Sequence, residues 1–187
     1  MSAGARPGQF ADMGEQSRID DASRKRRRAY IGLGSNMGDK RAMIATALDL
    51  LGATPGIAVT ARSRDYRTPP WGDTDQDWFV NACAALDTTL APQDLLAACL
   101  AIEARMGRER TRRWGPRVID IDVLDYDRQV IVSDTLTLPH PRIAERAFVL
   151  TPLAEIAGDL PLGAMTVGEL ARRLADPTIV PFDDPSS

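Results

Sequence analysis

Two aspartates separated by a single residue are the side chains best suited to chemistry. Asp120 and Asp122 lie in the segment Val118–Asp125, where apolar residues alternate with others as in a β-strand. Successive strand side chains point to opposite faces, so both carboxylates share one face, about 7 Å apart, and Ile119 and Ile121 face the other. Mg²⁺ prefers such hard oxygen ligands. The pair therefore predicts a magnesium site, although a solvated strand face gives the same pattern.

The loop before this strand is rich in arginine. Five guanidinium groups follow Gly107 within a short stretch: Arg108, Arg110, Arg112, Arg113 and Arg117. Guanidinium groups match phosphate oxygens in charge and in hydrogen-bond geometry, so a basic loop leading into an acidic pair suits a magnesium nucleotide. Two other interpretations stay open: an RNA site in which Trp114 stacks on a base, and an exposed charged loop without a ligand.

A glycine-containing segment invites comparison with phosphate-binding loops. It reads Gly32-Leu33-Gly34-Ser35-Asn36, and it lacks both the third glycine of the dinucleotide fingerprint and the Gly-Lys-Ser/Thr of a Walker loop. We therefore expect a tight turn there, and ATP binding must depend on other residues.

His140 is the single histidine of the chain, which excludes histidine-rich zinc sites. A Ser/His/Asp hydrolase is merely conceivable. The residue lies in Leu138-Pro139-His140-Pro141, where the prolines restrict the backbone. It is interpreted either as a turn residue or as a positioned phosphate contact.

Composition limits the class of protein. The 187 residues carry a formal net charge of -3, which does not favour nucleic acid or an anionic membrane as a partner. Cys83 and Cys99 lie in separate apolar segments, which argues against a disulfide framework and favours a reducing cytoplasm. No apolar run is long enough to span a membrane. We expect a cytoplasmic monomer.

Hydrophobic periodicity predicts the order strand, helix, two strands, helix, strand, followed by short pieces. The expected strands cover 29–33, 57–66, 78–86 and 118–125, and the expected helices cover 39–51 and 92–107. A short strand at 129–132 and short helices at 152–157 and 167–174 complete the chain. This order predicts an α+β domain with a ferredoxin-like (split βαβ) core, its helices packed on a mixed or antiparallel sheet.

The two ends of the chain differ from this pattern. Residues 1–28 show no hydrophobic period and end in a basic run, which predicts a disordered N-terminal extension. The domain itself is expected over 29–175, with a C-terminal tail at 176–187.

Four separated blocks together resemble the 6-hydroxymethyl-7,8-dihydropterin pyrophosphokinase family from about Tyr30 to Leu174. The blocks are Tyr30-Ile31-Gly32-Leu33-Gly34-Ser35-Asn36; Tyr66-Arg67-Thr68-Pro69-Pro70 with Phe79-Val80-Asn81; Arg113 through Leu124; and Leu138-Pro139-His140-Pro141 with Arg146-Ala147-Phe148. The third block, which joins R-W-G-P-R to D-I-D, is the most specific. Pro141 and Asp125 depart from the family pattern.

The resemblance implies transfer of pyrophosphate from ATP to the hydroxymethylpterin, with AMP as the other product, in tetrahydrofolate biosynthesis. It implies that Asp120 and Asp122 bind two Mg²⁺ ions that bridge the ATP phosphates, and that Arg108, Arg110 and Arg117 contact the nucleotide. Further ATP-side positions are implied at Glu103, Trp114, Thr137, His140 and Arg146.

For the pterin, the resemblance implies a ring held between Phe148 and Phe79, with Asn81 at its polar edge and Thr68, Pro69 and Trp71 lining the same pocket. Two other classes stay open: a nucleic-acid-binding module that uses the tail and the arginine loop, and a catalytically silent relative that serves as an interaction domain.

Overall fold

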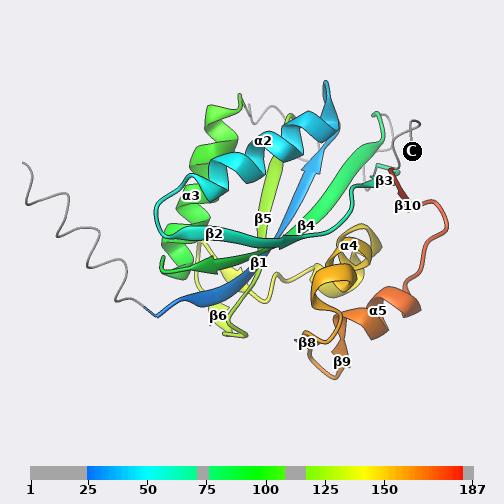
Figure 1. Ribbon diagram of the computed structural model, residues 1–187. Coiled ribbons are helices and arrows are strands. Elements are labelled where there is room, and N and C mark those ends of the chain that lie inside the picture. Colours follow the sequence, from blue (N-terminus) through cyan, green and yellow to red (C-terminus); the bar gives the residue numbers. More distant parts are fainter. Residues whose placement is uncertain (1–24, 71–75, 108–116, 183–187) are drawn as a thin grey trace, which may run out of the picture.

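A single sheet forms the centre of the molecule in the computed structural model, which describes residues 25–70, 76–107 and 117–182. Its strands are β1 (Arg27–Ser35), β2 (Ile57–Arg62), β3 (Tyr66–Thr68), β4 (Phe79–Thr88), β5 (Asp120–Tyr126) and β10 (Val180–Pro181). The order is β10-β3-β4-β1-β5, and β2 also pairs with β4 (Figure 1). Each of these pairings is antiparallel.

Two helices cover one face of this sheet. Helix α2 (Lys40–Gly52) begins after Asp39, whose carboxylate accepts a hydrogen bond from the Ala42 amide. Helix α3 (Pro92–Arg105) begins with its proline, a residue preorganised for the first helical turn. Leu95 and Cys99 of α3 are fully buried in the core beneath β1, β4 and β5, as their helical spacing predicts. Cys99 is therefore a core thiol.

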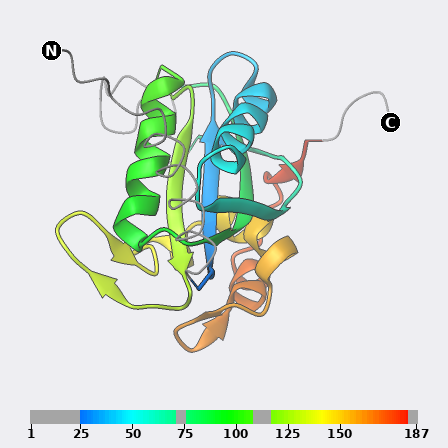
Figure 2. The same ribbon diagram turned by 60° about the vertical axis from the view of Figure 1, so that its left-hand side comes forward.

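A small hairpin follows β5. It consists of β6 (Ile131–Val132) and β7 (Thr137–Leu138) and extends away from the sheet (Figure 2). Its second strand leads into the segment that contains His140, whose backbone amide donates to the Leu124 carbonyl of β5 (2.8 Å). The hairpin therefore returns the chain to the central sheet.

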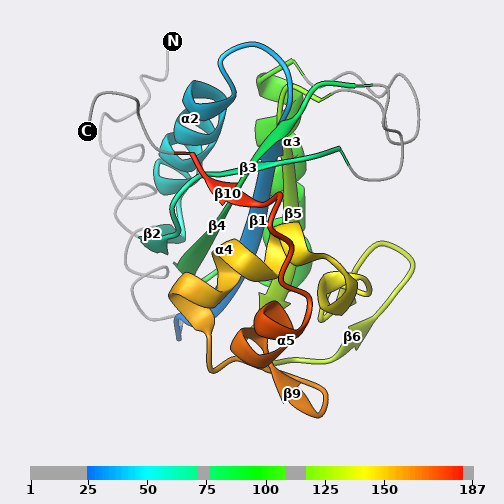
Figure 3. The same cartoon turned by 90° about the vertical axis from the view of Figure 1, so that its right-hand side faces the viewer.

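Two further helices cover the opposite face (Figure 3). After the 3-10 turn η1 (Ile143–Glu145), these are α4 (Ala147–Ala157) and α5 (Val167–Arg173), separated by the hairpin of β8 (Pro161–Leu162) and β9 (Met165–Thr166). Their apolar side chains form a second core around Cys83 of β4 and Leu124 of β5: Ile143, Val149, Leu150, Leu153 and Val167. No helix among the described residues is long and apolar enough to cross a membrane.

The architecture is thus α+β with an antiparallel sheet, and the order of the long elements agrees with the sequence-based prediction. The predicted strand at 57–66 divides into β2 and β3, which both pair with β4. Helix α4 begins five residues before the expected 152–157 and contains Pro152. Strand β5 continues beyond Asp125 to Tyr126, so the polar residue does not end it.

Both ends of the described chain contribute to the sheet. Arg27 and Arg28, which the sequence places in the N-terminal extension, form the start of β1 and pair with Asp127 and Asp87. At the other end β10 pairs with β3. The proposed division into 1–28, 29–175 and 176–187 otherwise stays a prediction, because most of the extension lies outside the described residues.

Candidate active site

A pocket opens on the α4 side of the sheet, where β1, β4 and β5 meet the start of α4. Ten of the residues singled out from the sequence line it together: Thr68, Pro69, Phe79, Asn81, Arg117, Asp120, Asp122, His140, Arg146 and Phe148. They come from segments up to 80 residues apart, so only the folded chain brings them together. Trp71, Arg108, Arg110 and Trp114 lie outside the described residues.

The acidic pair lies on one wall of the pocket. Asp120 and Asp122 are 20% and 40% exposed in their side chains, whereas Ile121 between them is buried in the opposite core. The strand alternation inferred from the sequence is therefore confirmed. Each carboxylate faces an arginine: Asp120 pairs with Arg117, and an Asp122 oxygen lies 3.5 Å from Nη1 of Arg146. The wall thus combines oxygen ligands with cationic groups.

Two glycines of β1 form the floor of the pocket. A Cβ on Gly34 would lie 2.8 Å from the Asn81 side-chain oxygen, too close for the two to coexist without a shift. A Cβ on Gly32 would meet Leu124 at an ordinary 3.6 Å. The predicted tight turn over this segment is wrong, because Gly32 through Ser35 continue the strand. The glycines instead leave space on the site-facing side of β1.

The amide of Asn81 lies at the polar edge of the pocket. Its Nδ2 donates a hydrogen bond to the Thr68 hydroxyl (2.6 Å), which joins β4 to β3 across the sheet. Phe79, two residues earlier on the same strand, also lines the pocket, and Phe148 enters it from α4. The guanidinium carbon of Arg146 lies 5.7 Å from the Phe148 ring centroid. Aromatic and amide groups are therefore available to a flat polar ligand.

Asn36 fixes the end of the arginine loop to β1, a role that the sequence did not reveal. Its side-chain oxygen accepts from the Arg117 amide (2.7 Å), and its own amide donates to the Arg117 carbonyl (3.2 Å). Its side-chain nitrogen donates to Gln76 (3.0 Å), which also lines the pocket. One indication that Asn36 has a role at the site was present in the sequence, since this residue ends the first of the four blocks that carry the family resemblance.

His140 is held as a neutral ring at physiological pH. Burial and the neighbouring Arg146 lower the pKa of His140 to about 4. Its Nδ1 accepts a hydrogen bond from the Arg142 amide (3.2 Å), an assignment consistent with an unprotonated nitrogen. The ring is therefore available for hydrogen bonding rather than as a cation.

Glu103 and Thr137 do not line this pocket. Glu103 is 3% exposed, and its carboxylate accepts from the Ile121 amide (2.7 Å), so it binds helix α3 to β5 between the two aspartates. Thr137 lies in β7, opposite Val132. Their predicted contacts with ATP stay predictions.

Carboxylates and arginines face one another beside a pocket lined by aromatic and amide side chains, an arrangement suited to an enzyme whose substrates carry phosphate groups. The family model for 7,8-dihydro-6-hydroxymethylpterin-pyrophosphokinase (HPPK) matches residues 30–158. The chain belongs to this family of pyrophosphate-transferring enzymes of folate biosynthesis. The resemblance inferred from the four sequence blocks is thereby confirmed.

Curated relatives support the assignment. The chain is 64% identical to the 2-amino-4-hydroxy-6-hydroxymethyldihydropteridine pyrophosphokinase of Methylorubrum extorquens over 151 aligned residues. The alignment covers 81% of this chain and 95% of the relative. The chain is 47% identical to the enzyme of the same name from Pseudomonas aeruginosa, over 72% of this chain and 83% of the relative.

A solved structure supports the fold. The Plasmodium falciparum HPPK-DHPS structure with pterin and p-hydroxybenzoate superimposes on 84% of this chain with a TM-score of 0.65 at 16% identity. This chain spans 45% of that longer chain. At such low identity the match concerns the fold of the shared domain alone.

Proposed function

We propose that this protein transfers the pyrophosphoryl group of ATP to 6-hydroxymethyl-7,8-dihydropterin and releases AMP, at the pocket between β5 and α4. Family membership supports the reaction. The observation that carries the assignment of the site is that Asp120 and Asp122 share one pocket with Asn81 and Phe148. A wall with carboxylates and arginines and a wall with aromatic and amide groups are thus adjacent, which supports binding of both substrates in one pocket.

The acidic pair fits magnesium bound together with ATP. No three His, Cys, Asp or Glu side chains gather into a metal cage within the described ranges. Mg²⁺ commonly uses one or two carboxylates and takes its other ligands from water and phosphates, so a two-carboxylate wall suits it. We infer that Asp120 and Asp122 hold two ions. When bound, these ions would neutralise charge on the phosphoryl oxygens.

The arginines supply the remaining positive charge. Arg117 and Arg146 pair with the two aspartates, so both guanidinium groups lie at the site. We infer that both guanidinium groups would contact phosphate oxygens of bound ATP, and that Arg108 and Arg110 would add contacts from the preceding loop. His140, neutral at pH 7, contributes a hydrogen bond on the ATP side.

The pterin is assigned to the opposite wall. Asn81 can both donate to and accept from the polar edge of the ring. Phe79 and Phe148 stack on its faces, and Thr68 fixes the Asn81 amide. Pro69 and Trp71 are assigned to the same side, and Glu103, Thr137 and Trp114 are assigned to the ATP side. The hydroxymethyl oxygen then attacks the β-phosphorus with release of its hydroxyl proton, as the bond from this phosphorus to the oxygen that leaves with AMP breaks. Positioning and electrostatics supply most of the catalysis.

The central strands support a ferredoxin-like core. The chain runs β1, α2, β2–β3, β4, α3, β5, and the strands lie in the order β3, β4, β1, β5 with antiparallel neighbours. Two interleaved βαβ units generate this order. We also propose a cytoplasmic monomer without nucleic-acid or membrane partners. The net charge of -3 supports the absence of polyanionic partners, and the two buried free cysteines support a reducing compartment.

AMP formation tests the proposed function. The protein is incubated with ATP, Mg²⁺ and 6-hydroxymethyl-7,8-dihydropterin beside an Asp122→Asn variant, which keeps the shape of the side chain but removes its charge. Asp87→Asn, at the surface pair with Arg28, serves as the matched control. We expect pterin-dependent AMP, reduced about a hundredfold or more in Asp122→Asn and within about twofold of the parent in the control.

Failure of this test has two forms. If the parent binds ATP and pterin but makes no AMP, the chain is a silent relative. If it binds neither compound, the assignment of the pocket is wrong.

A further inference from the structure

We propose that Glu155 is a positioning residue for the pterin pocket, because its carboxylate binds helix α4 to the segment that carries β3. The inference rests on the function proposed above, since it concerns the affinity of that pocket for the pterin. Glu155 lies outside the pocket lining, so its effect must pass through the two elements that it joins.

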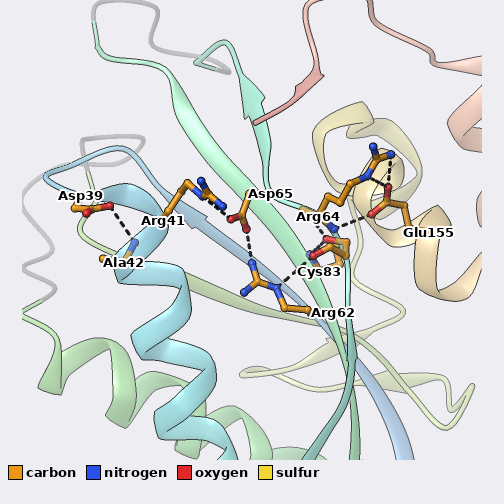
Figure 4. Close-up of polar contacts among 9 residues, drawn as sticks. Asp39, Arg41, Ala42, Arg62, Arg64, Asp65, Cys83 and Glu155 are labelled. Atoms are coloured by element: carbon orange, nitrogen blue, oxygen red, sulfur yellow. Dashed lines mark hydrogen bonds and ion pairs between the residues drawn. The ribbon is translucent and has the colours of Figure 1, made fainter. Parts of the chain in front are cut away.

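The carboxylate of Glu155 accepts three hydrogen bonds from one short segment. One oxygen accepts from the Arg64 backbone amide (2.8 Å). The other accepts from Arg64 Nε (2.7 Å) and from the Tyr66 hydroxyl (2.7 Å). Figure 4 shows the Arg64 guanidinium beside the Glu155 carboxylate, with the two side chains coming from separate elements of the fold. Charged hydrogen bonds of this type are among the strongest in proteins.

The environment keeps this carboxylate charged. Burial raises the pKa of Glu155, but the hydrogen bonds from Arg64 and Tyr66 more than offset this effect, so the pKa lies below its usual value. The Glu155 side chain is 24% exposed, whereas that of Arg64 is 62% exposed. The pair with Arg64 alone would contribute little at such exposure. The contacts to the backbone amide and to the largely buried Tyr66 distinguish this cluster from a surface ion pair.

Helical geometry connects Glu155 to the pocket along α4. Phe148 precedes Glu155 by seven residues, which is close to two full turns, so both side chains lie on the same face of the helix about 10 Å apart. Phe148 lines the pocket and Glu155 contacts β3. A rotation or shift of α4 that released Glu155 would therefore also move Phe148.

Strand geometry makes the same connection on the other side. Tyr66 and Thr68 are two residues apart in β3, so their side chains face the same side of the sheet. Tyr66 is 5% exposed and Thr68 is 1% exposed, and the Thr68 hydroxyl accepts from Asn81. Glu155 thus links two elements that each support an assigned pterin contact. Helix α4 carries Phe148, and strand β3 carries Thr68, which binds Asn81.

The segment that receives Glu155 is itself fixed on its other side. The Ser63 hydroxyl accepts from the Cys83 amide (2.9 Å) of β4. Asp65 accepts from Arg41 of α2 (3.1 Å) and from Arg62 (2.6 Å), and Figure 4 shows both arginines converging on this carboxylate. Because Ser63 and Asp65 anchor the segment to the sheet and to α2, Glu155 holds α4 against a fixed support.

Three variants test the proposal. Glu155→Gln keeps the size of the side chain but replaces one acceptor oxygen with a donor group, and Tyr66→Phe removes only the hydroxyl. Glu169→Gln is the matched control, because Glu169 also accepts from a backbone amide, that of Thr166 (2.8 Å), but in the exposed cap of α5. Steady-state kinetics with both substrates are combined with calorimetric pterin binding in the presence of a non-hydrolysable ATP analogue, and with thermal unfolding.

A positioning role predicts a selective effect. In Glu155→Gln we expect the KM and Kd for the pterin to rise about tenfold, with KM for ATP and kcat within about twofold of the parent. Tyr66→Phe should raise these pterin constants by a smaller factor. In the double variant the constants should rise by less than the product of the two single-variant factors, because both changes break the same cluster. Glu169→Gln should lose thermal stability without changing the pterin constants.

Three results would overturn the proposal. Pterin constants unchanged in Glu155→Gln, with a lower melting temperature alone, would show a purely structural role. Equal rises in KM for ATP and for the pterin would show a general disturbance of the site. A parent protein that neither binds nor converts the pterin would overturn the proposed function itself, an outcome that the wild-type measurement separates from the other two.

Discussion

At the scale of single residues, Gly34 gives the sharpest test of how β1 shapes the pocket. An added Cβ would lie 2.8 Å from the Asn81 oxygen, so Gly34→Ala must displace the amide that we assign to the polar edge of the pterin. We expect KM for the pterin to rise about tenfold or more, because the substrate would lose a hydrogen bond to the displaced Asn81 amide. KM for ATP should change little.

Gly52→Ala is the control for this change. Gly52 ends α2, and a Cβ there would meet only the Val59 side chain at 3.9 Å, an ordinary contact. Its kinetic constants should match those of the parent. Equal pterin constants in Gly34→Ala and the parent, measured by initial rates of AMP formation, would show that Asn81 does not bind the pterin in this position.

At the scale of elements, the C-terminal strand β10 covers the outer edge of β3. Besides the pairing of Val180 with Arg67, the Phe182 amide donates to the Asp65 carbonyl (2.8 Å), and the Phe182 ring lies 5.2 Å from that of Trp78. Trp78 directly precedes Phe79 of the pocket. The strand thus supports the edge of the sheet nearest to the assigned pterin site.

Deleting residues 178–187 should therefore lower stability. Losing the contacts of the Phe182 ring costs about 2 kcal/mol, which corresponds to a melting temperature lower by about 4 to 8 °C for a chain of this size. Deleting only 183–187 leaves Phe182 and β10 in place and is the matched control. Equal melting temperatures for the two truncated proteins, measured by circular dichroism, would show that β10 contributes nothing to the sheet.

At the scale of the whole molecule, the sequence predicts what depends on local periodicity. The common face of Asp120 and Asp122 follows from the alternation within one strand, and the buried face of α3 follows from its helical spacing. The pairing of β10 with β3 could not be predicted in this way, because a strand of two residues has no period. Nor could the contact between Arg64 and Glu155, which joins residues 91 apart in the chain.

The sheet also separates two hydrophobic cores, of which only one adjoins the pocket. Leu95 of α3 lies in the core shared with α2, and Leu153 of α4 lies in the core next to the pocket; both are fully buried. Replacing either leucine with alanine removes the same atoms and should cost about 2 to 5 kcal/mol of unfolding free energy, measured by urea denaturation.

The two variants should nevertheless differ in function. Leu153 lies five residues after Phe148 on the helix that forms one pocket wall, so its loss lets α4 relax into the cavity and moves that wall. We expect Leu153→Ala to raise KM for the pterin several-fold at a temperature where both variants are folded. Leu95→Ala should stay within about twofold of the parent, since the sheet separates it from the pocket. Equal pterin constants in the two variants would contradict the division of function between the faces.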